Sequence, residues 1–203
     1  MKKNKISKNW INKQHRDIYV RKSKIEGYRS RAAYKIEEIN TKFKIFKNQT
    51  YVVDLGAAPG SWTQYLVNNY NNCKILTVDI KNLNPIPNCN HIVGDFTEEK
   101  IKEKIKKFFD RRIDVIMSDM AVNTTGNKGL DSLVTGELCL DAMKFSIELL
   151  SDSGTFVSKI FMGKSFNEII ELSKKYFKKT SIFKPPASRK DSKESFIISK
   201  FLR

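Results

Sequence analysis

The sequence has few of the residues that mark secreted, membrane-spanning or metal-binding proteins. It contains only three cysteines, Cys73, Cys89 and Cys139, which lie far apart and form no C-x-x-C pair. A disulfide framework and a zinc site are therefore not expected, and we expect no other metal site. No run of about 18 apolar residues occurs, so we expect no membrane-spanning segment.

The N-terminus is rich in lysine and lacks an apolar stretch, which argues against a secretory signal. The expected location is the cytoplasm or an organelle (mitochondrion or nucleus), and secretion is not expected. The chain has 203 residues, of which 40% are hydrophobic. This composition suits one folded domain. No pattern indicates a dimer, and we expect a monomer.

Positive charge is abundant and unevenly placed. The net charge is +16, and residues 1–35 hold 12 lysines and arginines against two acidic residues. Residues 174–203 hold 10 against two, so the rest of the chain is slightly acidic. If the basic ends meet in space, they form one face that attracts phosphates. The alternative is a pair of solvated tails, but aromatic residues interrupt the first basic run and the second has the pattern of a strand.

Hydrophobic patterning predicts short apolar strands that alternate with helices. Helices are expected over 31–41, 61–68, 98–109, 133–150 and 166–177, and strands over 51–55, 75–79, 91–93, 113–117, 154–160, 180–183 and 196–201. A polar loop is expected over 123–131. The alternation predicts an α/β, Rossmann-like fold: a mostly parallel seven-stranded sheet with helices on both faces. The last two strands are joined by too few residues for a parallel crossover, so the last strand should run antiparallel.

Ligands of such sheets bind beyond the carboxyl ends of the strands. There, residues 53–62 combine a strand, a glycine turn and a helix start. The spacing is G-x-x-x-G rather than the G-x-G-x-x-G of dinucleotide sites, which disfavours NAD and suits a nucleoside cofactor such as S-adenosylmethionine. Asp79 could accept from both ribose hydroxyls of such a cofactor, and Asp95 from its adenine amine. A single aspartate at a strand end is as often a helix cap as a ligand-binding residue. With Asp119, three successive strands end in an aspartate next to the glycine loop, which favours a ligand site.

Five motifs, in order along nearly the whole chain, resemble those of the FtsJ-type (heat-shock) ribosomal RNA 2′-O-methyltransferases. They are the glycine loop with its flanks, 54–64, and the segments 27–35, 117–121, 156–161 and 184–195. The family's usual proline after S-D-M-A is Val122 here. The resemblance implies a single S-adenosylmethionine methyltransferase domain over 30–203, preceded by a basic, RNA-binding extension over 1–29.

In that family four residues, K-D-K-E in chain order, form the active site, and the matching positions here are Lys35, Asp119, Lys159 and Glu194. The expected cofactor contacts are Gly56, Ala57, Pro59, Gly60, Ser61, Trp62, Asp79, Asp95 and Asp119. The implied reaction is transfer of a methyl group from S-adenosyl-L-methionine to the 2′-hydroxyl of a ribose. A uridine of large-subunit ribosomal RNA is the expected target, and S-adenosyl-L-homocysteine is the product.

A ribose hydroxyl attacks a sulfonium methyl group only when its proton is removed or its oxyanion is stabilised. A lysine serves as the base if a second cation and partial burial bring its pKa toward neutrality. We hypothesise that Lys159 takes the proton, while Lys35 tunes Lys159 and holds the ribose or a phosphate. Asp119 would orient Lys159 near the sulfonium, and Glu194 would position the ribose or the lysine pair. Only the resemblance distinguishes Lys35 and Glu194 from ordinary surface residues.

The candidate RNA contacts are Arg29, Arg31, Arg189 and Lys190, because both basic segments flank proposed catalytic residues. Ribosomal RNA is the expected partner, either free or within the large ribosomal subunit. Three other functions stay open: 2′-O-methylation of a tRNA or an mRNA cap, a non-catalytic RNA-binding assembly factor, and a small-molecule methyltransferase.

Overall fold

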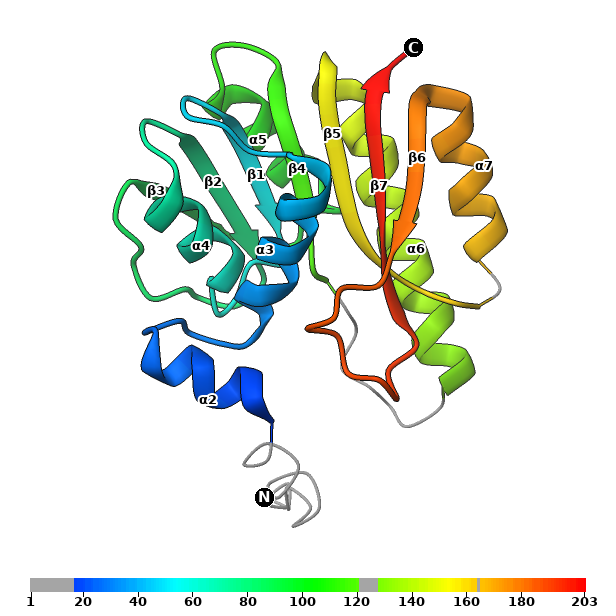
Figure 1. Cartoon of the computed structure of the whole chain (residues 1–203). Helices are drawn as coiled ribbons and strands as arrows, with labels where there is room; N and C mark the ends of the chain where they lie inside the picture. The colour runs from blue at the N-terminus through cyan, green and yellow to red at the C-terminus, as the bar shows by residue number, and fades with distance from the viewer. Residues whose placement is uncertain (1–16, 121–127, 164) are drawn as a thin grey trace, which may run out of the picture.

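The computed structural model describes residues 17–120, 128–163 and 165–203 (Figure 1). Its strands are β1 (Tyr51–Leu55), β2 (Lys74–Asp79), β3 (Cys89–Val93), β4 (Ile113–Ser118), β5 (Leu150–Phe161), β6 (Phe177–Phe183) and β7 (Glu194–Leu202). Its helices are α2 (Ile18–Ile25), α3 (Ala32–Phe43), α4 (Ser61–Asn69), α5 (Glu99–Phe108), α6 (Lys128–Leu149) and α7 (Phe166–Tyr176). Within these residues, no helix has both the length and the apolar character needed to cross a membrane.

The described strands form one seven-stranded sheet in the order β3-β2-β1-β4-β5-β7-β6. Strands β1 to β5 run parallel, and β7 lies antiparallel between β5 and β6. The predicted α/β fold, including the antiparallel last strand, is therefore confirmed. The chain moves outward from β1 to β3 and then returns to β4 on the other side of β1. Such a reversal leaves a crevice at the carboxyl ends of β1 and β4.

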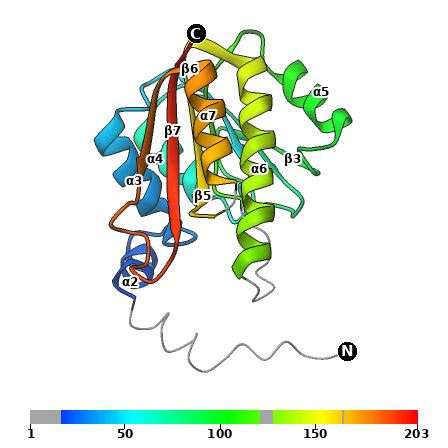
Figure 2. The ribbon, with the colours of Figure 1, turned by 90° about the vertical axis from the view of Figure 1, so that its right-hand side faces the viewer.

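Helices cover both faces of the sheet, as Figure 2 shows from the β6 edge. Helices α3 and α4 pack on one face, where Ile36 and Leu66 share a core with Val52. Helices α5, α6 and α7 pack on the other face, where Ile105 and Met143 share a core with Val53 of β1. Because both faces are buried, the central strands read as continuous apolar runs rather than as alternating patterns.

Helix α2 is an element that the sequence does not predict. Its apolar residues Ile18 and Ile25 are 64% and 85% exposed, so no buried apolar stripe marks it. Asp17 caps this helix by accepting the Tyr19 backbone N–H at 3.1 Å. Helix α2 lies near the end of the sheet at which the parallel strands finish (Figure 1).

The predicted polar loop over 123–131 is wrong over 128–131, where α6 has already begun. Gly129 favours a loop in the sequence, but a glycine in a helix costs only about 1 kcal/mol relative to alanine. The packing of a 22-residue helix offsets that cost. Residues 123–127 lie outside the described residues, as does Val122. The extension predicted over 1–29 is described only from residue 17 onward.

Candidate active site

Four elements bring the K-D-K-E residues together. Lys35 lies in the first turn of α3, and Asp119 directly follows β4. Lys159 lies in β5, and Glu194 is the first residue of β7. In the parallel pair β4 and β5, Ser118 lies opposite Ser158, so the Asp119 and Lys159 positions that follow are neighbours. In the antiparallel pair β5 and β7, Phe161 lies opposite Glu194, close to Lys159 along the same strand.

The four side chains form a series of alternating charges. Lys159 Nζ lies 2.5 Å from Asp119 Oδ1 and donates to the Asp119 backbone carbonyl at 2.9 Å. Lys35 Nζ lies 3.9 Å from the other carboxylate oxygen of Asp119 and donates to Glu194 Oε2 at 3.0 Å. The side chains are only 9% to 19% exposed. Their attraction therefore acts largely out of water, where charges interact most strongly.

Two buried aspartates in this region have opposite pKa shifts. Burial disfavours ionisation of Asp119, but the ammonium groups of Lys159 and Lys35 outweigh it and lower the pKa of Asp119 below its ordinary value. For Asp54 in β1, burial raises the pKa to about 7, and the negative charge of Asp119 adds to that shift. The Thr63 hydroxyl donates to the Asp54 carboxylate at 2.8 Å and opposes the shift in part.

A cavity of about 460 Å³, here called the strand-end cavity, opens beyond the carboxyl ends of β1 to β4. Four predicted cofactor residues line it: Gly56, Asp79, Asp95 and Asp119. Ile80, Phe96 and Met120 add apolar surface that the sequence did not indicate. A single apolar residue next to a strand end has no distinctive pattern, so no signal in the sequence could have identified them.

Asp79 and Asp95 are oriented by neighbouring backbone and side-chain groups. The two carboxylate oxygens of Asp79 accept the backbone N–H groups of Ala58 and Lys81, each at 2.8 Å. Asp95 Oδ1 accepts the backbone N–H of Thr97 at 2.9 Å and its hydroxyl at 2.7 Å. A carboxylate offers about four acceptor positions, so both aspartates retain capacity for further donors.

Two glycines of the loop after β1 are required by its geometry. Gly56 has a φ of 71°, and a Cβ there would overlap the side chain of Met120. Gly60 begins α4 with a φ of 102°, and its Cβ would lie 2.7 Å from Ile86 Cδ1 and 3.0 Å from Arg29 Nη1. A larger residue at either position would face both a strained backbone and occupied space.

The other predicted cofactor residues of the loop line a smaller cavity of about 50 Å³ that also reaches Asp119: Ala57, Pro59, Ser61 and Trp62. Trp62 is only 3% exposed, and its indole N–H donates to the Ala32 carbonyl at 3.0 Å. Its ring lies 5.7 Å from that of Phe196. Trp62 therefore also packs α4 against α3 and β7.

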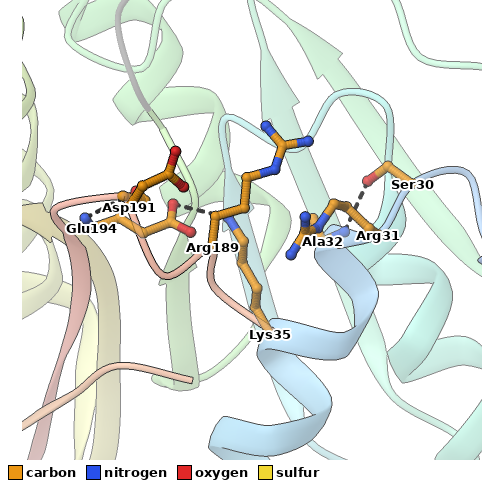
Figure 3. Close-up of a pocket in the computed structure, with 8 residues that line it drawn as sticks. Ser30, Arg31, Ala32, Lys35, Arg189, Asp191 and Glu194 are labelled. Atoms are coloured by element: carbon orange, nitrogen blue, oxygen red, sulfur yellow. Dashed lines mark hydrogen bonds and ion pairs between the residues drawn. The ribbon is translucent and has the colours of Figure 1, made fainter. Parts of the chain in front are cut away.

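Lys35 and Glu194 line a third cavity, of about 390 Å³ (Figure 3). Arg31 and Arg189 belong to its wall, and we call it the arginine-lined cavity. Figure 3 shows Lys35 reaching from α3 toward Glu194. Because Asp119 lines the strand-end cavity and contacts Lys35, the K-D-K-E residues lie where the two cavities approach each other.

Asp17 holds the two arginines of the arginine-lined cavity. Its Oδ2 contacts Arg31 Nη1 and lies 3.3 Å from Arg189 Nε. Arg31 also donates to the Ala187 backbone carbonyl. Lys190, which follows Arg189 in the chain, is exposed. Asp17 is not among the site residues predicted from the sequence, although an aspartate directly before a helix is a recognisable capping signal.

Arg29, the fourth predicted RNA contact, is placed differently. Its guanidinium donates to the backbone carbonyls of Pro59, Asn84 and Pro85. The side chain is thus engaged within the protein. Among the described residues, no group of three or more histidine, cysteine, aspartate or glutamate side chains could hold a metal ion.

The topology and the site define a class. A mostly parallel sheet with an antiparallel last strand, a glycine turn after β1 and acidic residues beyond the next strands are the features of S-adenosylmethionine-dependent methyltransferases. The model of the FtsJ-like methyltransferase family matches residues 28–201, and the chain belongs to this family. The predicted family resemblance is confirmed.

Named relatives agree with this placement. The chain is 58% identical over 203 residues to ribosomal RNA large subunit methyltransferase E of Pelagibacter ubique, with 100% of both chains covered. It is 43% identical to the protein of the same name from Rickettsia akari, with 95% of this chain and 88% of that one covered. A crystal structure described as a ribosomal RNA methyltransferase, from Plasmodium falciparum, has a TM-score of 0.77 at 32% identity and covers 86% of this chain and 98% of that one.

Proposed function

We propose that the protein transfers a methyl group from S-adenosyl-L-methionine to a ribose 2′-hydroxyl, that of a uridine in large-subunit ribosomal RNA. The observation that carries the proposal is the placement of the K-D-K-E residues where the strand-end and arginine-lined cavities approach each other. One cavity suits a nucleoside cofactor and the other a phosphate-bearing substrate. The relatives named as large-subunit ribosomal RNA methyltransferases support the choice of RNA.

The strand-end cavity fits the cofactor in size and in chemistry. Gly56 lines the cavity without a side chain of its own, and Asp79 offers an oriented carboxylate for ribose hydroxyls. Phe96 and Ile80 supply apolar surface suited to a flat base, and Asp95 offers an acceptor for an amine. When bound, S-adenosylmethionine supplies an electrophilic methyl group on a sulfonium.

In the proposed reaction bound S-adenosylmethionine would supply the methyl group that the 2′-oxygen accepts, and the hydroxyl proton is taken by Lys159. Asp119 fixes its position through two contacts, one from the carboxylate and one from the backbone carbonyl. Lys35, held by Glu194 at 3.0 Å, places a second cation beside the arginine-lined cavity, where it can hold the ribose or a phosphate.

The proposed RNA contacts are Arg31, Arg189 and Lys190. The first two line the arginine-lined cavity, and Lys190 is exposed beside them. Arg29 leaves this set because it does not line the arginine-lined cavity and its guanidinium donates to backbone carbonyls of two other loops. We further propose that the enzyme acts as a monomer where ribosomes are made. The named bacterial relatives favour the cytoplasm and give no support to an organelle.

Transfer of labelled methyl groups tests the proposal. The purified protein is incubated with labelled S-adenosylmethionine and ribosomal RNA, tRNA or undermethylated large subunits, and the RNA is digested to nucleosides. Label in 2′-O-methyluridine from ribosomal RNA or subunits is the expected result. Label in tRNA alone would keep the reaction and overturn the substrate. Measured cofactor binding without label in any RNA would favour the non-catalytic assembly factor.

A further inference from the structure

The Arg29 side chain joins two loops on either side of the strand-end cavity. Its Nη1 donates to the Pro59 carbonyl at 2.9 Å and to the Asn84 carbonyl at 2.7 Å. Its Nη2 donates to the Pro85 carbonyl at 2.7 Å. Pro59 belongs to the glycine loop after β1, whereas the other two belong to the connection between β2 and β3. One guanidinium therefore bridges segments that follow neighbouring strands.

The backbone on both sides of this bridge is also anchored. The Arg29 N–H donates to Gln64 Oε1 at 2.9 Å, and Gln64 Nε2 donates back to the Gly27 carbonyl at 2.8 Å. Gln64 lies on α4, the helix that follows the glycine loop, so these bonds tie the turn before α3 to that helix. Arg29 is consequently held at its backbone and at its guanidinium.

The space around Gly60 shows how closely these loops meet. A Cβ on Gly60 would lie 2.7 Å from Ile86 Cδ1, 3.0 Å from Arg29 Nη1 and 3.2 Å from Leu83 Cδ1. Leu83 and Ile86 are both buried at 7% exposure. The two loops thus pack against each other around the guanidinium. The glycine loop also bonds to the end of β2, where Gly56 N and Ala57 N donate to the Val78 carbonyl at 2.8 and 3.3 Å and Ala58 N donates to Asp79 Oδ2 at 2.8 Å.

We propose that Arg29 is a positioning residue for the cofactor site rather than an RNA contact. By holding the two loops together, it keeps the glycine loop at the distance from Asp79 that a bound nucleoside requires. A guanidinium suits this role because it presents several N–H groups in a fixed plane, which a lysine does not. The inference rests on the proposed S-adenosylmethionine site.

The test measures binding of S-adenosylhomocysteine and of ribosomal RNA to the full chain by calorimetry and filter binding. Arg29→Met should weaken S-adenosylhomocysteine by about tenfold or more, since charge-assisted hydrogen bonds are lost. RNA affinity at saturating S-adenosylhomocysteine should stay within about twofold, because the guanidinium does not meet RNA. Arg112→Met is the matched control. Arg112 also donates to backbone carbonyls, those of Leu150 at 2.8 Å and Glu148 at 3.4 Å, but beside the start of β4.

Two further variants separate positioning from general loss of structure. Arg29→Ala should regain S-adenosylhomocysteine affinity when methylguanidinium is added at low millimolar concentration, an effect that a merely destabilised fold would not show. Arg29→Lys keeps the charge and one donor direction, so it should bind with intermediate affinity. It also serves if the methionine variant does not fold.

The outcomes distinguish this inference from the proposed function. Wild-type protein that does not bind S-adenosylhomocysteine would overturn both. If the wild type binds and Arg29→Met binds equally well, only the positioning role is overturned. The same holds if Arg29→Met loses RNA affinity while S-adenosylhomocysteine binding is retained, because that result returns Arg29 to the RNA face.

Discussion

The strand-end cavity and the arginine-lined cavity approach each other at the K-D-K-E residues but are built differently. The first is formed mostly by strand ends whose side chains bond locally, as Asp79 does with Lys81 and Asp95 with Thr97. The second joins the turn before α3 to the segment before β7. Its contacts cross most of the chain, such as the ion pair between Asp17 and Arg189. The aspartates of the first cavity are thus oriented partly by residues next to them in the chain, whereas the second cavity exists only after distant segments have docked.

The contrast would be sharpened most by a change at the junction itself. Lys159→Ala should lower turnover by about a thousandfold, within the range for loss of a general base, while S-adenosylhomocysteine affinity is retained. Single-turnover methyl transfer and calorimetry measure the two quantities. Lys174→Ala is the control, since its side chain on α7 is 62% exposed. Near-normal turnover of the Lys159 variant would remove Lys159 from its proposed role.

The two buried aspartates provide a second comparison, in stability against pH. A raised pKa in the folded state means that the Asp54 contribution is present at low pH and is lost as the pH rises from 3.8 to about 7. The change amounts to on the order of 4 kcal/mol across that window. Asp119, whose pKa is lowered, contributes stability that is lost as the pH falls below its ordinary range.

Asp54→Asn should therefore flatten the decline in the free energy of unfolding between pH 4 and pH 7, because asparagine has no carboxyl group to ionise. Its side-chain carbonyl can still accept from Thr63. Urea unfolding of the wild type and the variant at a series of pH values measures this. An unchanged slope in the variant would show that Asp54 is not the group that titrates.

Gly60→Ala tests the glycine loop that borders the strand-end cavity. Gly60 has a φ of 102° and close neighbours, so the variant should bind S-adenosylhomocysteine about tenfold more weakly. Gly27→Ala is the matched control, because Gly27 also has a positive φ but a Cβ added there would meet nothing within 4 Å. Both should lose some stability from backbone strain. Equal binding by the two variants would mean that the space around Gly60 does not matter to the ligand.

The smallest effect is expected from removing hydrogen bonds that support the arginine-lined cavity from outside its wall. Glu38 accepts the Ala187 backbone N–H at 2.7 Å and the Tyr19 hydroxyl at 3.1 Å, so it ties the C-terminal segment and α2 to α3. Glu38→Ala should raise the KM for RNA several-fold, by the loss of about 1 kcal/mol, and leave S-adenosylhomocysteine binding unchanged. Glu38→Gln, which keeps one acceptor, should lie between. A loss of cofactor affinity in either variant would break the distinction between the cavities.

Much of the architecture was predictable because hydrophobic pattern and spacing act locally. The apolar run before Gly56 and the short link before β7 each predicted what the structure shows, and Asp79 and Asp95 lie at or just beyond the ends of β2 and β3. Helix α2 was missed because Ile18 and Ile25 face solvent and leave no buried apolar stripe. The start of α6 was misplaced because Gly129 weighs more in a sequence pattern than in a packed helix.

Local pattern was sufficient for the sheet, the glycine turn and the acidic strand ends, since each depends on residues near one another in the chain. It could not show that Asp17 holds Arg31 and Arg189, or that Arg29 donates to the loops after β1 and β2. Those arrangements depend on segments that meet only when α2, α3 and β7 pack on one sheet. The function of an arginine is set by the acceptors that lie within its reach, and folding places those acceptors.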